Sequence, residues 1–262
     1  MTRFGQNRDF LFAANFVPVD VAAHSFNFKW NGPEAHLAPA RKTPLSKALL
    51  GKTNCALFVL TAGTLVWAAR RMDRIADVLP ALCMSEALLC YQDDANYVRR
   101  DRPNHLESAM TKQREIIETL CYETTAIFQA TPGEHSSRPP IQAAENVISV
   151  TRHILGLDWE SPFRDWVKST LSRLDQIASN PSQTFMSAYD FESDDDFAKY
   201  IISNVGPPLP ISVCDTGVSP EPASLRRQYD EFLGGVDWTS NPYLAPPEMM
   251  RALGSCIAYG GV

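Results

Sequence analysis

The most informative feature of this sequence is the set of motifs that it lacks. Its six cysteines form no Cys-x-x-Cys pair, its five histidines form no His-Glu-x-x-His or His-x-His pair, and Gly-x-Ser-x-Gly does not occur. The cysteine and histidine patterns are typical of zinc sites and redox centres, and the serine pattern is typical of hydrolases. The sequence therefore predicts no metal site and no cofactor, and it favours a protein without catalytic residues.

Positive charge is also scarce. The 24 Lys and Arg residues are outnumbered by 30 Asp and Glu residues, which gives a formal net charge of −6. Because neutralisation of phosphates supplies most of the affinity for nucleic acid, an acidic chain without a basic stripe is not expected to bind DNA or RNA. The dispersed cysteines indicate reduced thiols, and the start of the chain has no apolar leader of the usual length, so we expect a cytoplasmic protein.

A membrane-spanning segment is not expected either. The longest apolar run, residues 55–69 (CALFVLTAGTLVWAA), is bounded by charged residues on both sides. It is shorter than the roughly 20 apolar residues that cross a bilayer, and runs of this length are more often buried helices. We predict a core helix here. Trp67 should be buried between this helix and a second one that starts near Asp73 and is bent or begun by Pro80.

One phosphate-binding motif is nearly present. Residues 46–53 (SKALLGKT) match Gly-x-x-x-x-Gly-Lys-[Ser/Thr] except that Ser46 stands at the first position. In the full motif, the first glycine lets the loop turn tightly around a phosphate, and this sequence has Ser46 in its place. The motif must also follow a strand, which residues 36–42 (HLAPARK) do not form. We favour a coincidental match. The alternative is an enzyme or nucleotide-binding protein that uses a degenerate phosphate loop around Lys52.

Helical spacing dominates the rest of the chain and predicts an all-α fold, a single multi-helix domain. Residues that favour helix ends support this prediction, among them Thr43-Pro44 at a start and Gly156 at an end. Besides the central pair, helices are expected over residues 106–128, 140–155, 161–178, 197–202 and 225–233.

Two segments depart from the helical pattern. Polar and apolar residues alternate over residues 24–30, as in a half-buried strand, and residues 211–213 are a second short candidate strand. We therefore expect residues 1–43 to form a short extended arm, or a β-hairpin, packed on the helices. Residues 44–262 should form an all-helical domain with an irregular C-terminal third.

Acidic residues cluster in residues 189–197 (YDFESDDDF). Three of them match the first ligand positions of an EF-hand, but the Gly and Glu that the loop needs later are absent. A helix start capped by Ser193 or Asp194 fits the pattern better. Carboxylates beside aromatic rings can also steer and anchor a basic protein. The predicted partner-binding residues are Tyr189, Asp190, Phe191, Glu192, Asp194, Asp195 and Asp196.

The functional prediction combines the missing catalytic motifs, the negative charge and the helical scaffold. Together they indicate a non-catalytic cytoplasmic protein-binding module whose partner is another, basic protein. Immunity proteins, which neutralise bacterial toxins, share this profile of a small acidic cytoplasmic protein. The likeness is one of composition only, because no motif carries it.

Overall fold

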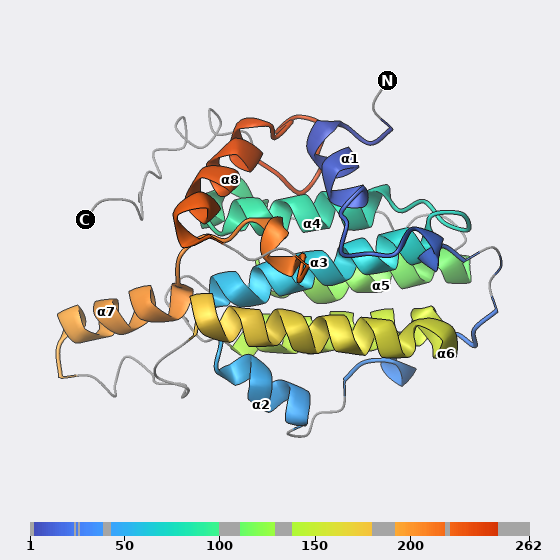
Figure 1. Ribbon diagram of the computed structural model, residues 1–262, viewed down its shortest axis with the longest axis horizontal. Coiled ribbons are helices and arrows are strands. Elements are labelled where there is room, and N and C mark those ends of the chain that lie inside the picture. Colours follow the sequence, from blue (N-terminus) through green and yellow to red (C-terminus); the bar gives the residue numbers. More distant parts are fainter. Residues whose placement is uncertain are drawn as a thin grey trace.

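α3 (Asn54–Met72) is the centre of the computed structural model, which describes residues 3–23, 25, 27–38, 43–99, 111–128, 138–179, 192–217 and 221–245. Over these residues the protein is a single all-α domain with eight helices and no strand, as predicted (Figure 1). The other helices are α1 (Gln6–Phe12), α2 (Pro44–Leu50), α4 (Leu79–Tyr91), α5 (Lys112–Thr125), α6 (Arg138–Ile177), α7 (Asp194–Val205) and α8 (Pro222–Gly234).

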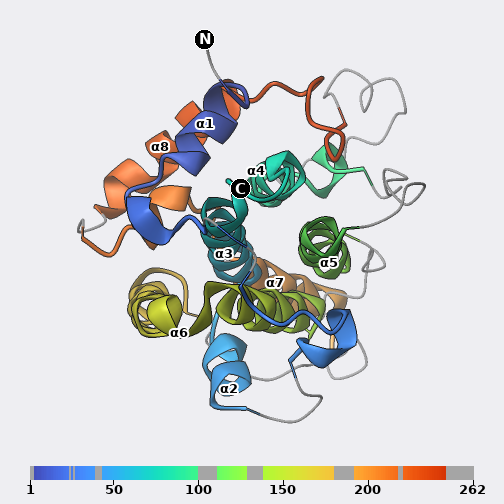
Figure 2. The same cartoon turned by 90° about the vertical axis from the view of Figure 1, so that its right-hand side faces the viewer.

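Other helices surround α3 on several sides (Figure 2). All of its residues except Asn54 and Arg70 are buried. Thr61 and Thr64 are tolerated there because their hydroxyls donate to the carbonyls of Leu57 and Leu60, at 2.7 and 2.8 Å. Among the described residues, α3 is the one helix long and apolar enough to cross a membrane, but 94% of that apolar window is buried inside the protein. The predicted core helix is confirmed.

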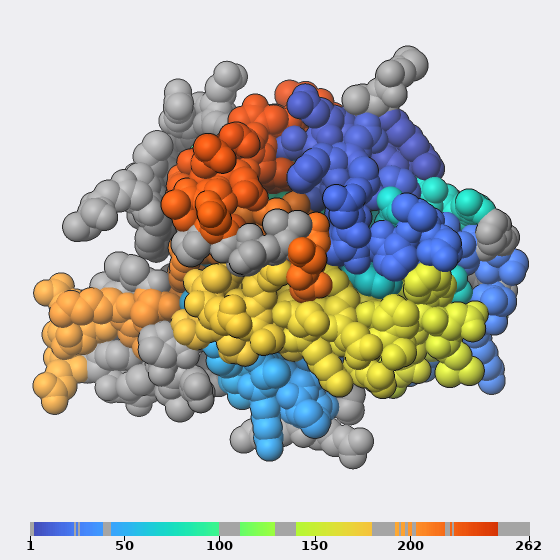
Figure 3. All heavy atoms as spheres, in the orientation of Figure 1, coloured from blue at the N-terminus to red at the C-terminus, as the bar shows by residue number. Residues whose placement is uncertain are grey.

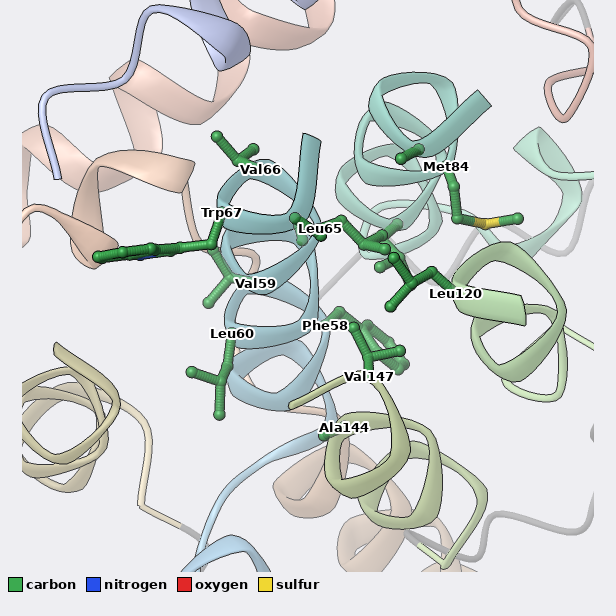
Figure 4. Close-up of a cluster of buried hydrophobic side chains, with 14 of the residues drawn as sticks. Phe58, Val59, Leu60, Leu65, Val66, Trp67, Met84, Leu120, Ala144 and Val147 are labelled. Carbon is green, nitrogen blue, oxygen red and sulfur yellow. The ribbon is translucent and has the colours of Figure 1, made fainter. Parts of the chain in front are cut away.

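The core forms where α4, α5 and α6 converge on α3. Leu120 from α5 and Val147 from α6 point towards it, Ala144 of α6 lies beside them, and Met84 from α4 extends towards α5 (Figure 4). Trp67 is buried, as predicted, with 1% of its surface exposed. Its ring packs against α6 rather than between the two apolar helices. The prediction placed Trp67 between the two apolar helices. Helical spacing predicts which face of a helix is buried, but it does not predict which other helix packs against that face.

α6 is a helical hairpin with its turn at Gly156, whose φ of 69° interrupts the helical backbone. Its two halves both contact α3. Arg71 Nε donates to the carbonyl of Ile154 at 2.9 Å, and the amide of Thr53 donates to the carbonyl of Ala178 at 3.1 Å, so the second half runs antiparallel to α3. The predicted end at Gly156 is confirmed. The second half starts directly after the glycine rather than at Pro162, because the glycine alone supplies the left-handed turn.

Local signals placed several other helix boundaries correctly. Thr43 caps α2 in a reciprocal capping box with Ser46, and Pro44 follows it in the first turn. α4 starts at Leu79 with Pro80 in its first turn. These features depend on residues within one turn of each other, which is why the sequence alone predicts them.

The structure differs from the predicted extended arm or β-hairpin at the N-terminus. Residues 6–12 form a helix, and the described part of residues 24–30 is in no strand. The chain nevertheless contributes Leu11, Val17, Val21 and Trp30 to the central core. Its backbone bonds to α3 instead of to a neighbouring strand: the amide of Ala23 donates to the carbonyl of Arg71 at 2.9 Å.

The second predicted strand, residues 211–213, is also wrong. Ile211–Cys214 is a short 3₁₀ helix, η5, pressed against α3 at Gly63. A Cβ at Gly63 would lie 2.9 Å from Cys214 Sγ and 3.1 Å from the Trp166 ring. The absent side chain therefore lets η5 and α6 approach α3 closely, and this tertiary contact overrides the β-propensity of the segment.

Candidate functional site

The acidic segment contains the start of α7. The Ser193 hydroxyl accepts from the amide of Asp196 at 3.2 Å and donates to its carboxylate at 2.8 Å, so Ser193 caps the helix. The hydrogen bond from the Ser193 hydroxyl, followed by the hydrogen bond and charge of Lys199, lowers the pKa of the Asp196 carboxylate. Because the chain is already helical from Asp194, it does not follow the ligand loop of an EF-hand, and the capped-helix interpretation is confirmed.

This end of α7 projects from the body of the molecule (Figures 1 and 3). Glu192, Asp195 and Asp196 are exposed on it, and Asp196 forms a 3.2 Å ion pair with Lys199. Of the other predicted partner-binding residues, Tyr189, Asp190 and Phe191 lie outside the described residues, as does the side chain of Asp194. The structure thus places three predicted carboxylates together at an exposed helix start.

The second candidate, the phosphate-loop match, is folded in another way. Residues 46–50 are part of α2, so their backbone amides do not form a phosphate-binding loop. Lys52 is almost fully enclosed, and its ammonium group donates to the carbonyl of Ala48 at 3.0 Å and to Asp175 at 2.5 Å. Thr53 caps α3. The groups that would hold a phosphate are therefore already engaged within the protein.

The N-terminus of α3 is also covered. Gly206, at the end of α7, lies so close to Thr53 that a Cβ at the glycine would be 2.5 Å from the threonine side chain. The Cys55 thiol donates to the carbonyl of Gly206 at 3.4 Å. A phosphate at this helix start would have to displace the backbone of residue 206, so the geometry does not support the nucleotide alternative.

A buried polar cluster, which the sequence reasoning missed, joins three distant parts of the chain. Arg8 of α1 lies 3.6 Å from Glu86 of α4, and both side chains are at most 5% exposed. The Asn241 amide donates to Glu86 at 2.9 Å and to the carbonyl of Cys83 at 2.8 Å. Arg8 also donates to the Ser240 hydroxyl at 2.6 Å.

Burial raises the pKa of Glu86, while the Asn241 hydrogen bond and the charge of Arg8 oppose that rise. All polar partners of the carboxylate named above come from within the protein, so the cluster fastens α1 and the segment after α8 to α4. One signal was available in the sequence: Glu86 is the single charged residue of α4. A charge in an apolar helix usually has a buried partner, but the sequence does not name it.

The five cysteines of the described residues are poor nucleophiles. All five are buried and none forms a disulfide, and burial raises the pKa of Cys83 to about 11 and of Cys121 to about 12. A thiol must lose its proton to attack or to bind metal, so these groups are unsuited to either role at neutral pH. Within the described part of the chain, no three His, Cys, Asp or Glu side chains are gathered to hold a metal ion.

Two histidines that are far apart in the sequence meet in the structure. The ring centroids of His36 and His153 lie 3.7 Å apart, and the planes are nearly parallel. Sequence spacing could not show this pair, since a loop and α6 bring it together.

Comparisons of the chain with protein-family models, with curated proteins and with solved structures found no match.

Proposed function

We propose that this protein is a non-catalytic cytoplasmic module that binds another protein, and that the partner is basic. The role resembles that of immunity-type proteins, which neutralise a bacterial toxin by binding it. The contact surface in this proposal is the acidic segment, residues 189–196, at the start of α7.

The observation that carries the proposal is the exposed acidic start of α7. Residues 192–200 hold four carboxylates, Glu192, Asp194, Asp195 and Asp196, and one cation, Lys199, a net charge of −4 + 1 = −3. Three of those carboxylates are exposed on a helix end that projects from the body (Figure 3). A projecting charge cluster attracts a partner of opposite charge at long range and speeds its association.

Stabilising the start of α7 through the helix dipole does not require four carboxylates. One acidic residue in the first turn, such as Asp196 with its capping bond to Ser193, already complements the positive end of the helix dipole. Glu192 lies before the helix and Asp195 points to solvent, so neither is needed for the cap. Their repulsion weakens the isolated protein slightly, and a cationic partner would relieve it.

The test uses a double variant, Glu192→Gln with Asp195→Asn, that removes two charges and leaves the Ser193–Asp196 cap intact. The tagged protein is exposed to a lysate of its source cells at about one and about three times physiological ionic strength, and the retained proteins are identified. We expect wild type to retain a basic protein at the lower salt and to lose it at the higher, as exposed charge pairs are screened. The variant should not retain it.

The matched control is Asp158→Asn with Asp165→Asn, which removes two exposed charges from the second half of α6. It should retain the same protein as wild type. Equal retention by the α7 variant and by wild type at both salt concentrations would reject the acidic segment as the contact surface. If the protein retains only acidic proteins, the proposal that its partner is basic would be rejected.

A further inference from the structure

Residues 27–38, called the strap below, lie across α5 and α6 (Figure 2). Hydrogen bonds hold the strap to these helices, and three of them are made by groups outside the histidine rings. The Ser149 hydroxyl donates to the carbonyl of His36 at 2.7 Å, the amide of Ala38 donates to Asn146 at 3.2 Å, and the indole of Trp30 donates to Glu115 at 2.8 Å.

Three rings stack between the strap and α6, and a fourth meets the stack edge-on. His36 of the strap lies between Trp30, at 4.7 Å, and His153 of α6, at 3.7 Å, with nearly parallel planes in both pairs. Phe28 meets the other ring, His153, edge-on at 5.9 Å. Trp30 is buried by this arrangement, with 4% of its surface exposed. The stack therefore adds side-chain packing to the hydrogen bonds between the strap and α6.

The hydrogen bonds define the protonation of both rings. His36 Nε2 accepts from the amide of Asn31 at 3.3 Å, and a ring nitrogen that accepts carries no proton. His153 Nε2 lies 2.8 Å from the carbonyl of Lys29, which can only accept, so this nitrogen carries the proton. The stacked arrangement thus requires a neutral His36.

Charging both imidazoles opposes the stack in two ways. Two cations 3.7 Å apart repel each other, and protonated His36 loses the hydrogen bond from Asn31. Burial first, and the charge of His153 second, lower the pKa of His36. Stacking of His36 on Trp30 favours the charged form of the His36 ring. Burial and the charge of His153 outweigh this attraction, so the pKa of His36 is lowered.

The surrounding charges are engaged elsewhere or lie on the strap itself. On α5, Glu115 accepts from Trp30, and on α6, Arg152 pairs with Glu160 at 2.9 Å. The strap carries Lys29 and Glu34, both exposed. Among the charged groups of the described residues, His153 is the one whose charge lowers the pKa of His36.

We propose that the strap is a pH-sensitive element that leaves α5 and α6 when the solution becomes acidic, because the stacked His36 and His153 rings cannot both carry a positive charge. Release uncovers Trp30 and Asn146, which are buried in the closed form. The direction follows from linkage. The pKa of His36 is below its ordinary value in the closed form, so the open form binds more protons. The closed form is favoured at neutral pH and loses stability as pH falls below about 6.5 towards the lowered pKa.

Hydrogen exchange tests the proposal on the intact protein at pH 7.5 and pH 5.0, with rates corrected for the intrinsic effect of pH. We expect the protection of peptides covering residues 27–38 to fall by about tenfold or more, since each proton taken up only by the open form changes the equilibrium about tenfold per pH unit. Peptides from α3 should keep their protection. In His36→Gln, which can still accept from Asn31 but does not titrate, the fall should disappear.

The control variant is Ser149→Ala, which removes one bond to the strap without removing a titratable group. It should lower strap protection by a similar factor at both pH values. Equal strap protection at the two pH values in wild type would overturn the proposal. So would an undiminished fall in His36→Gln, or a loss of protection in α3 as large as that in the strap, because the whole domain would then be unfolding.

Discussion

Replacing Trp67 with alanine is expected to lower the free energy of unfolding by about 3–5 kcal/mol. The indole is 1% exposed, and its centroid lies 5.4 Å from the ring of Phe163 and 5.7 Å from that of Trp166. A buried Trp removes about 150–250 Å² from water, worth about 4–6 kcal/mol at about 25 cal/mol per Å². Alanine keeps a small part of this, and α3 has helices around it that limit collapse into the cavity.

Trp67→Phe is the matched variant. Trp67 Nε1 has no hydrogen-bond partner in the described part of the protein, and an unpaired buried donor costs about 1–3 kcal/mol. Phenylalanine keeps one aromatic ring against Phe163 and Trp166 and removes this donor. Relief of that cost offsets much of the lost packing, so the expected loss is below about 1.5 kcal/mol, the range of well-tolerated core substitutions.

Urea denaturation followed by far-ultraviolet circular dichroism measures both changes. We expect the midpoints to shift while the slopes stay equal, which indicates a change in stability and not in the denatured state. Thermal melting should fall by about 2–4 °C per kcal/mol in a domain of this size. If Trp67→Ala is within 1 kcal/mol of wild type, Trp67 is not at the centre of the core. If phenylalanine costs as much as alanine, the argument from the unpaired donor is wrong.

Three further predictions follow from other contacts. Arg8→Ala leaves Glu86 buried without its cation and should lower the free energy of unfolding by about 3–5 kcal/mol in urea denaturation near pH 8. Because burial raises the pKa of Glu86, this loss should shrink as pH falls towards that pKa, and a loss independent of pH between 8 and 5 contradicts the argument. Gly206→Ala places a Cβ 2.5 Å from the Thr53 side chain at a φ of 70°, so thermal melting should reveal a loss of at least about 1–3 kcal/mol, and an unchanged melting temperature would exclude the close contact. Magnesium with 1 mM ATP or GTP should leave the melting temperature unchanged, because Lys52 is bonded to Asp175. Binding with a dissociation constant of about 0.1 mM would stabilise the protein by about 1.4 kcal/mol, and the resulting rise in melting temperature would restore the nucleotide hypothesis.

Gly234→Ala serves as the control for Gly206→Ala. It lies in the last turn of α8, where an added Cβ meets nothing within 4 Å. Alanine favours the helix more than glycine does, so this variant should melt at the same temperature as wild type or slightly higher. The contrast separates the clash at Thr53 from the general effect of adding a methyl group.

The sequence by itself determined the features that depend on neighbouring residues. The apolar run of residues 55–69 indicated the core helix, and Thr43, Pro80 and Gly156 indicated helix boundaries that the structure has. Ser193 indicated the cap of α7. Caps, prolines and positive-φ glycines act within about one helical turn, and burial follows from composition along a single helix, so no knowledge of the fold was required.

Only the tertiary structure decided which distant residues meet. Arg8, Glu86 and Asn241 come from three separate segments, and no spacing in the sequence links them. His36 and His153 stack because a loop crosses α6, although alternation nearby suggested a strand. A strand forms only where a neighbouring strand can take up its backbone hydrogen bonds. Here the amide of Ala23 bonds to the carbonyl of Arg71 in α3, and the carbonyl of Lys29 bonds to His153 in α6. Partners of this kind are set by how the helices pack together, which is a property of the whole chain.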